Sequence, residues 1–199
     1  MEPILFIITG PSGAGKGSVM RRVLSQVPNL TKVVTYTTRA PRAGETDGFD
    51  YHFCSTERFH QLVSDGTIFE YEQVYRDHFY GSPRELFPGG ADALMELDYR
   101  GHRKYRARYA ATVSVFLLPP GLDELTRRIV ARSEVPNLEN RLANAVEQLE
   151  HAHEYDYVVK NDDLEVCTRK VAHIIETERI RRSGRAALAE ILAEVSRRR

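Results

Sequence analysis

The chain has 199 residues, of which 42% are apolar and 28% charged, a composition that suits a globular protein of one domain and excludes a disordered or fibrous chain. Its 28 basic and 28 acidic side chains cancel, so no overall field selects a nucleic acid or an acidic membrane as partner. The distant Cys54 and Cys167 fit neither a zinc site nor a disulfide framework, so we expect reduced thiols in a cytoplasmic protein.

The first expected element is a buried strand at residues 4–9, "ILFIIT", a short run of mostly branched apolar residues. This run is too short to span a bilayer and follows an acidic residue, so it predicts neither a membrane helix nor a targeting segment. From Lys16 onwards Val19, Val23 and Val27 recur every four residues, which predicts a helix. A strand, a glycine-rich loop and a helix therefore follow one another in the order that a phosphate-binding P-loop requires.

The loop itself reads "GPSGAGKGS" and starts at Gly10. Its glycines let the backbone curl so that several N–H groups point at one phosphate, and the dipole of the following helix favours the same anion. Lys16 adds a positive charge close to the bridging and terminal phosphoryl oxygens. Gly17 stands where the general pattern has Ser or Thr, so either the match is accidental or disabled, or the loop belongs to a subclass that handles its metal differently.

Further along the chain, apolar runs alternate with helical patterns. The strands expected after the first one are 32–39, 49–53, 67–74, 91–98, 113–118 and 155–161. The helices expected after the first one are a short capped helix from about Thr56 to Gly66 and the ranges 101–110, 121–132, 138–154 and 163–182. This alternation indicates an open, mainly parallel α/β sheet that binds ligands beyond the carboxyl ends of its strands. The arginine-rich end, residues 179–199, predicts a solvated terminal helix.

A second phosphate site is indicated downstream of the loop. Arg39 and Arg42 are three residues apart, with Tyr51 and Tyr80 further along. Two guanidinium groups and two phenols can surround a phosphate monoester with directed, charge-assisted hydrogen bonds. A chain that binds one phosphate at Lys16 and another here has a donor site and an acceptor site.

At this point the chain resembles the guanylate kinases, within the nucleoside monophosphate kinases, over nearly all of its length. The blocks that carry the resemblance are "GPSGAGKGS", "TTRAPRAGETDGFDYHF", "FEYEQV", "YGSPR", "LMELDYRG", "LLPP", "NRL" and "YDYVVKNDD". The resemblance implies a P-loop fold of three layers, with helices on both faces of a parallel sheet, a small mixed α+β insert and a short helical lid. The expected subregions are a core (1–34, 91–127 and 150–199), a GMP-binding region (35–90) and a lid (128–149).

The resemblance assigns the phosphate of GMP to Arg39, Arg42, Tyr51 and Tyr80. It assigns the guanine to Thr35, Glu70, Ser82 and Asp98. Guanine presents N1–H and its N2 amino group side by side, and one ionised carboxylate, here Glu70, can accept both. Adenine carries an acceptor at N1, so an ionised Glu70 disfavours it. Either Thr35 or Ser82 could donate to O6.

The resemblance also implies that ATP is the phosphoryl donor and that Mg²⁺ bridges its phosphates. The residues expected to bind ATP are Gly10, Pro11, Ser12, Gly13, Ala14, Gly15, Lys16, Gly17, Ser18 and Asn161, the last of them near the adenine. The residues expected to assist catalysis are Lys16, Arg128, Arg132 and Arg141; the three arginines belong to a lid that closes over the donor phosphates and excludes water. Nucleoside monophosphate kinases often carry glycine at the position of Gly17, so Ser18 either reaches Mg²⁺ through water or binds a phosphate oxygen.

The expected reaction is ATP + GMP to ADP + GDP, with dGMP as a second acceptor, in purine nucleotide metabolism and GMP recycling. Alternatives are a kinase of the same fold for another phosphate monoester, such as a ribose bisphosphate, and a non-catalytic guanylate-kinase-like scaffold. The retained Glu70 and Thr35 argue against the first, and the complete P-loop argues against the second. We expect a monomer or homodimer with no nucleic-acid or membrane partner, although the basic end of the chain keeps RNA binding open as a weaker idea.

Overall fold

The computed structural model describes residues 2–42, 44–74, 78–131 and 138–197. Its larger sheet has five parallel strands in the order β2-β7-β1-β8-β9. Their bounds are β1 Leu5–Thr9, β2 Leu30–Lys32, β7 Asp92–Glu96, β8 Thr112–Leu118 and β9 Tyr157–Lys160. Because all five strands run the same way, their carboxyl ends share one edge of the sheet, and the P-loop leaves β1 at that edge.

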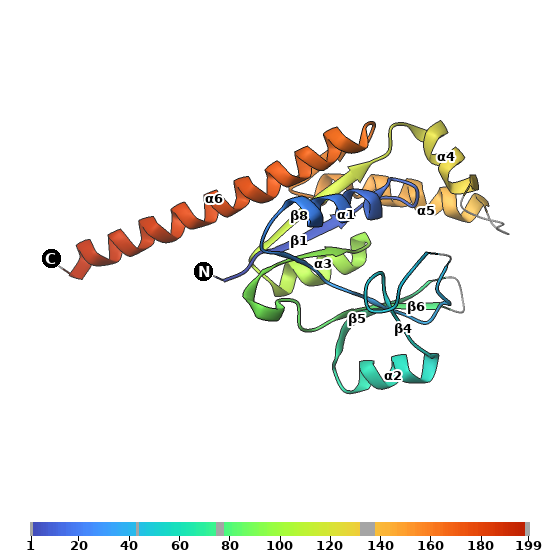
Figure 1. Ribbon diagram of the computed structural model, residues 1–199, viewed down its shortest axis with the longest axis horizontal. Coiled ribbons are helices and arrows are strands. Elements are labelled where there is room, and N and C mark those ends of the chain that lie inside the picture. The colour runs from blue at the N-terminus through green and yellow to red at the C-terminus, as the bar shows by residue number, and fades with distance from the viewer. Residues whose placement is uncertain (1, 43, 75–77, 132–137, 198–199) are drawn as a thin grey trace.

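Helices cover both faces of this sheet, which confirms the predicted three layers (Figure 1). Side chains alternate along β1, so Phe6 and Ile8 face one way and Leu5 and Ile7 the other. Phe6 and Ile8 pack in a cluster with α1 (Lys16–Gln26) and α6 (Leu164–Arg197). Leu5 and Ile7 pack with Tyr105 of α3 (Tyr99–Arg108). Burial on both faces explains why residues 4–9 are a continuous apolar run.

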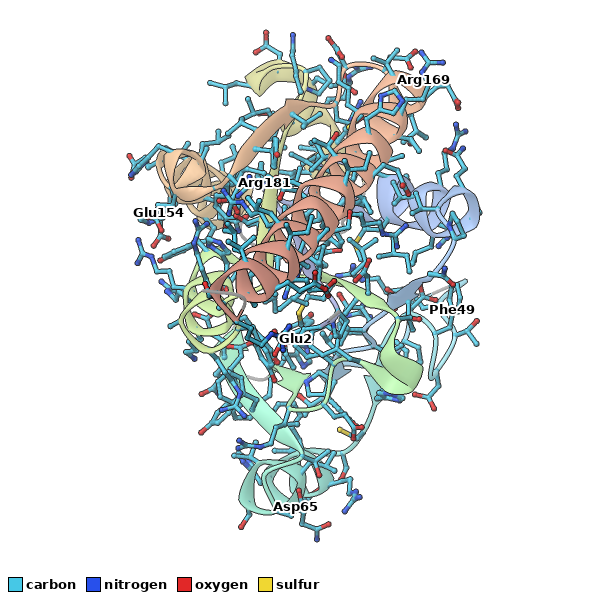
Figure 2. All side chains as sticks on the ribbon, turned by 90° about the vertical axis from the view of Figure 1, so that its left-hand side faces the viewer. Glu2, Phe49, Asp65, Glu154, Arg169 and Arg181 are labelled. Carbon is cyan, nitrogen blue, oxygen red and sulfur yellow. The ribbon has the colours of Figure 1, made fainter. Side chains whose placement is uncertain are left out.

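A second sheet of four strands, in the order β4-β3-β6-β5, lies below the first in the view of Figure 1. The bounds are β3 Tyr36–Thr37, β4 His52–Phe53, β5 Ile68–Val74 and β6 His78–Pro83. The sheet is mixed, because β3 pairs parallel with β4 and antiparallel with β6, which also pairs antiparallel with β5. In Figure 2 the larger sheet with its helices and the smaller sheet extend in opposite directions, with Arg169 near one end of the molecule and Asp65 at the other.

Helix α2 (Thr56–Ser64) covers the smaller sheet through Phe59 and Leu62. Its N-cap is Ser55, whose hydroxyl accepts a hydrogen bond from the backbone N–H of Arg58. Gly81 of β6 lies directly under this helix, and a β-carbon there would stand 2.7 Å from Phe59 Cζ. Only glycine permits so close an approach of strand and helix.

The predicted strand 32–39 is wrong as a single element. Its first part belongs to β2 of the larger sheet, and its second part is β3 of the smaller sheet. The backbone N–H of Val33 still donates to Leu94 O, whereas Thr35 O already accepts from His52 N, so the chain changes sheets between these two residues. The predicted strand 49–53 is shortened to β4, because residues 48–50 form a turn between Asp47 and Tyr51, which pair as an isolated β-bridge. Strand β6 was not predicted at all.

The helices near the predicted lid are α4 (Leu122–Ala131) and α5 (Leu138–Glu150). Helix α5 ends earlier than the predicted 138–154, because a 3₁₀ turn (η2, Ala152–Glu154) follows it. A further 3₁₀ turn, η1 (Pro88–Gly90), precedes β7.

The predicted helix 163–182 and the predicted terminal helix 179–199 are one continuous helix, α6, which runs to Arg197. Its second half projects past the sheet toward the C-terminus in Figure 1, as expected for a solvated terminal helix. No helix among the described residues combines the length and the apolar character that crossing a membrane requires.

Candidate active site

The P-loop is shaped by two glycines with left-handed backbone. Gly13 has φ +90° and Gly15 φ +88°, values that side chains disfavour. At Gly15 a β-carbon would stand 2.4 Å from Nδ2 of Asn161. Asn161 is buried at the end of β9, and its Nδ2 donates to Ala14 O at 2.7 Å. Asn161, directly after β9, therefore supports the curled backbone of the loop through Ala14.

Lys16 lies at the mouth of the loop. Its Nζ donates to Gly10 O at 2.5 Å and to Pro11 O at 3.2 Å, and lies 3.4 Å from a carboxylate oxygen of Glu96. These partners hold the ammonium group at the start of α1, where a phosphate also meets the helix N-terminus. The loop and its lysine have the arrangement that binds a nucleotide phosphate.

Arg128 of α4, which belongs to the predicted lid, reaches this loop. Its NH1 group donates to Gly13 O at 3.3 Å, and its Nε donates to Glu124 Oε1 at 2.6 Å. Arg127 is 76% exposed, as the sequence predicted. Arg132 and the side chain of Arg141 lie outside the described residues, so Arg128 is the one predicted lid arginine whose position can be given.

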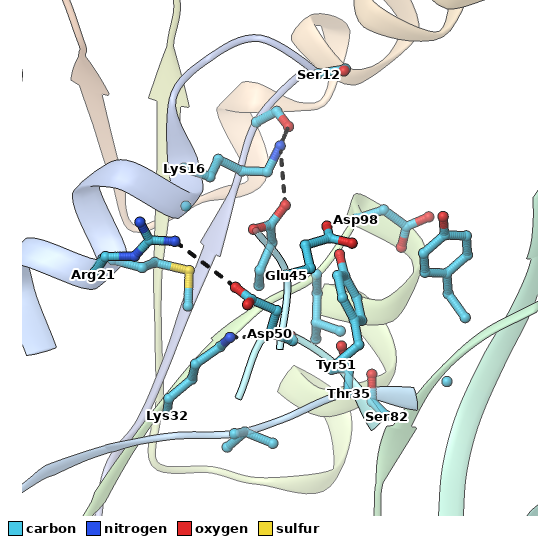
Figure 3. A pocket seen from close by; sticks show the side chains of 18 of the residues that line it. Ser12, Lys16, Arg21, Lys32, Thr35, Glu45, Asp50, Tyr51, Ser82 and Asp98 are labelled. Atoms are coloured by element: carbon cyan, nitrogen blue, oxygen red, sulfur yellow. Dashed lines mark hydrogen bonds and ion pairs between the residues drawn. The ribbon is translucent and has the colours of Figure 1, made fainter. Parts of the chain in front are cut away.

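A cavity of about 490 Å³ extends from the P-loop to the smaller sheet. Figure 3 places Ser12 and Lys16 on one side of it and Thr35, Tyr51 and Ser82 on the other. All eight residues predicted to bind GMP line this cavity: Thr35, Arg39, Arg42, Tyr51, Glu70, Tyr80, Ser82 and Asp98. From the predicted donor set the lining includes Gly10, Ser12, Gly13, Gly15, Lys16 and Gly17. Both predicted sites thus open into one space.

Some predicted donor residues stand apart from that wall. Among the described residues, those lining the cavity do not include Pro11, Ala14, Ser18, Asn161 or Arg128. Ser18 is exposed in the first turn of α1. Asn161 and Arg128 reach the loop from outside, through Ala14 and Gly13.

Arg39 is pre-oriented by an acidic residue that the sequence analysis missed. Its guanidinium is 8% exposed and forms two hydrogen bonds of 2.6 Å with the two carboxylate oxygens of Glu45. It also lies over the ring of Tyr51, 5.0 Å from the centroid. The hydrogen bonds from Arg39 lower the pKa of Glu45, and those to Glu45 raise the pKa of Arg39. Both groups therefore keep their charges, and a bidentate pair of this kind fixes the plane of the guanidinium.

Glu45 also organises its own loop. Its Oε2 accepts from the backbone N–H of Arg42 at 2.8 Å, so one carboxylate contacts the guanidinium of Arg39 and the backbone of Arg42. Tyr51 and Tyr80 meet edge to face at 6.0 Å between ring centroids. Burial raises the pKa of Tyr51, which keeps its phenol protonated as a hydrogen-bond donor. The acceptor side thus presents cationic and neutral donors together, the combination that a phosphate monoester requires.

Glu70 stands opposite Ser82 in the antiparallel register of β5 and β6. It is 9% exposed; the Ser82 hydroxyl donates to its Oε1 at 3.1 Å, and Lys104 Nζ of α3 donates to its Oε2 at 3.3 Å. Burial raises the pKa of Glu70, and Lys104 and Ser82 work against that rise. Lys104 was not among the predicted site residues, and no spacing in the sequence connects it with Glu70.

Asp98 caps α3 by accepting from the backbone N–H of Gly101 at 2.8 Å. Its neighbour on the cavity wall is Glu72, two residues beyond Glu70 on the same face of β5. Burial, followed by hydrogen bonding to Asp98, raises the pKa of Glu72 to about 7, and an ion pair with Arg100 opposes that rise. The base end of the cavity is therefore lined by carboxyl groups, which suits a ligand that presents N–H donors.

Comparison with known proteins agrees with this geometry. The guanylate kinase family model matches residues 2–178. A guanylate kinase of Paramagnetospirillum magneticum is 37% identical, covering 96% of this chain and 92% of its own length. One of Symbiobacterium thermophilum is 40% identical, covering 96% and 93%. The crystal structure of guanylate kinase from Anaplasma phagocytophilum superimposes with a TM-score of 0.74 at 31% identity, covering 88% of this chain and 86% of that one.

The match spans almost the whole chain and includes both sides of the cavity. It agrees with the parallel sheet and the P-loop described above, and it favours neither the ribose bisphosphate kinase nor the scaffold alternative. The chain belongs to the guanylate kinase family.

Proposed function

We propose that the P-loop side of the cavity binds ATP and the side formed by the smaller sheet binds GMP, so that the γ-phosphoryl group of ATP is transferred to GMP, the reaction of the family to which the chain belongs. The observation that carries the proposal is the single cavity shared by the P-loop and all eight predicted GMP-binding residues. Transfer needs donor and acceptor phosphates in line, and a shared cavity with a phosphate-binding group at each side provides that alignment.

On the donor side, the backbone N–H groups of the P-loop and Lys16 bind the β- and γ-phosphates. Asn161 supports the loop through Ala14, and Arg128 approaches it through Gly13. Arg128 together with Arg132 and Arg141 forms the lid that neutralises the charge of the transferring group and excludes water. The reaction needs little help from a general base, since phosphoryl transfer depends mainly on the positioning of the reactants and the stabilisation of charge.

On the acceptor side, Arg39 and Arg42 bind the phosphate of GMP with the phenols of Tyr51 and Tyr80. Glu45 orients the guanidinium of Arg39 and bonds the backbone of Arg42 before GMP arrives. At the other end of the nucleotide, the buried carboxylate of Glu70 accepts N1–H and the N2 amino group of guanine. A base that lacks this donor pair leaves a buried carboxylate unpaired, which disfavours it strongly.

Mg²⁺ fits this donor set only as an ion held mostly by the nucleotide. No cluster of three or more His, Cys, Asp or Glu side chains suited to a metal occurs among the described residues. Ser18 is exposed at the start of α1 and can reach the ion through water or bind a phosphate oxygen. When bound, Mg²⁺ neutralises the phosphates and keeps several waters, so a full protein cage is unnecessary.

The remaining assignments belong to the same proposal. We expect dGMP to serve as a second acceptor, because the predicted GMP-binding residues are assigned to the phosphate and to the guanine, and none of them to the 2′-hydroxyl of the ribose. We further propose a cytoplasmic monomer or homodimer that binds neither nucleic acid nor membrane.

The test is an ADP-release assay with ATP, Mg²⁺ and each of GMP, dGMP, AMP, UMP and CMP. We expect turnover with GMP and dGMP and rates at least about 100-fold lower with the other three, because a site built to hydrogen-bond a base rejects one that lacks its donors. No turnover with GMP would overturn the proposal. Comparable rates with AMP would remove the role given to Glu70.

A further inference from the structure

Glu70 needs both of its oxygens for guanine, yet both are already engaged. Ser82 donates to Oε1 and Lys104 to Oε2. A carboxylate has about four lone-pair directions, two on each oxygen. One donor on each oxygen leaves one direction free on each, which is the number that N1–H and the N2 amino group of guanine require.

The two existing donors approach from different sides. Among the described residues, the wall of the cavity includes Glu70 and Ser82 but not Lys104. Lys104 is half exposed on α3, with its ammonium group on Oε2. It therefore contacts the carboxylate from behind, where it does not compete with a base entering from the cavity.

We infer that Lys104 is a positioning residue for guanine recognition: it holds the Glu70 carboxylate ionised and rotated so that both oxygens face the base. The inference rests on the proposed role of Glu70 as the residue that reads guanine.

The groups around Glu70 make such a partner necessary. Asp98, at the start of α3, places a second negative charge nearby, and burial also favours the neutral acid. Tyr105 of the same helix adds no positive charge, and Gly101 approaches Oε1 so closely that a β-carbon there would stand at 3.2 Å. Among the described groups facing this carboxyl, Lys104 is the cation that opposes its protonation. A protonated Glu70 would offer guanine one acceptor and one misplaced donor.

The experiment measures kcat and KM for GMP and for ATP in Lys104→Met, which keeps most of the length of the side chain and removes its charge. We expect KM for GMP to rise about five-fold at pH 7.5, the effect of one partly exposed ion pair, with kcat and KM for ATP within two-fold of wild type. Lys104→Arg should restore most of the lost affinity. Lys170→Met, which removes an exposed lysine of α6, is the matched control and should change nothing.

The pH profile separates charge from mere packing. Without Lys104 the pKa of Glu70 rises, so Glu70 becomes protonated at a higher pH than in wild type. As the pH is lowered, KM for GMP should therefore begin to rise earlier in the variant. The phosphate of GMP also titrates near pH 6, but it does so equally with both enzymes, so the ratio of the two KM values is the quantity to follow. We expect that ratio to grow between pH 7.5 and 6. A constant ratio would contradict the inference.

A double substitution shows whether Lys104 acts through Glu70. In a Glu70→Gln background, Lys104→Met should raise KM for GMP no further. If Glu70→Gln alone leaves the preference for GMP over AMP unchanged, the role of Glu70 is wrong and the inference falls with it. If Glu70→Gln destroys that preference while Lys104→Met leaves KM for GMP unchanged at every pH, the inference about Lys104 alone is wrong.

Discussion

The donor side of the cavity is made by consecutive residues and mainly by backbone, whereas the acceptor side is assembled from side chains on several elements. Residues 10–18 form the P-loop, and its one charged member is Lys16. The acceptor wall combines side chains from the segment before β3, from the segment between β3 and β4, from β5 and β6, and from the start of α3. A backbone site recognises phosphate in general, while a side-chain site can recognise one base.

The two sides also differ in how their charges are held. Lys16 is held by carbonyl oxygens of its own loop, Gly10 and Pro11, and by Glu96. The main partners of Arg39 and Glu70 are instead single side chains of opposite charge, Glu45 and Lys104. The donor side should therefore tolerate substitutions around it that keep the loop curled, while the acceptor side should respond to changes in residues that touch no substrate.

The largest expected effect is at Lys16. Lys16→Met should lower kcat by about 10²- to 10³-fold, because it removes a full positive charge that stabilises the transferring phosphoryl group. KM for GMP should change little, since the acceptor side keeps its own contacts. Steady-state kinetics with both substrates varied, alongside thermal unfolding to confirm that the variant folds, measures this. A variant with more than a tenth of wild-type kcat would show that the loop does not depend on its lysine.

The next effect is at Glu70, on the acceptor side. Glu70→Gln should lower kcat/KM for GMP by about 100-fold and reduce its advantage over AMP, because the amide offers guanine one acceptor and one repelling donor. KM for ATP should stay within two-fold. The control is Glu85→Gln, an exposed carboxylate outside the cavity lining described above. Equal losses in the two variants would mean that net charge, and not base recognition, sets the effect.

The contrast between the two sides explains what the sequence could predict. The order of strand, glycine loop and helix is local, so residues 4–27 allowed both the P-loop and the first layers of the sheet to be predicted. The acceptor residues came from resemblance to a family, and the elements that carry them were predicted less well. Strand β6, which holds Tyr80 and Ser82, was missed, because its "HFYGSP" contains a glycine and a proline that weaken a strand pattern.

Glu45 and Lys104 were missed for a related reason. Each acts on a predicted site residue, Arg39 or Glu70, and touches it only after the chain has folded. Lys104 is 34 residues from Glu70, and the helical pattern predicted for 101–110 does not say which strand this side chain faces. The pairing of β5 with β6 brings Glu70 and Ser82 together, and a register shifted by one residue would turn them to opposite faces.

A smaller effect should distinguish two roles for Asn161. Asn161→Ala removes the hydrogen bond to Ala14 O, which should weaken ATP binding about ten-fold, a loss of 1–2 kcal/mol. If the residue acts by supporting the loop, binding of inorganic tripolyphosphate should weaken equally, since that ligand has phosphates and no adenine. Calorimetric titration of both ligands measures this, with Lys160→Ala, the exposed neighbour, as control. Weakening of ATP binding alone would place Asn161 at the adenine instead.

The smallest expected effect is on stability and concerns a buried histidine of α3. His102 of α3 is 1% exposed and stacks on Tyr155 at 4.3 Å, and among the described residues neither of its ring nitrogens has a hydrogen-bond partner. Burial, with help from Arg106, lowers its pKa to about 4. Between this value and the unfolded value near 6.5, the unfolded chain binds more protons, so protonation favours unfolding as the pH falls.

This histidine should therefore reduce the free energy of unfolding by roughly 1 kcal/mol between pH 7.5 and 5.8. Glu72 acts in the opposite sense over part of that range, because its raised pKa makes its protonation favour the folded state. The measurement is thus a difference: urea unfolding of wild type and of His102→Leu at both pH values. Relative to wild type, His102→Leu should gain roughly 1 kcal/mol in free energy of unfolding when the pH is lowered from 7.5 to 5.8. KM for GMP and for ATP should stay the same. A difference in stability that does not change with pH would contradict this prediction. It would mean that water or a hydrogen-bond partner reaches the imidazole of His102 in solution.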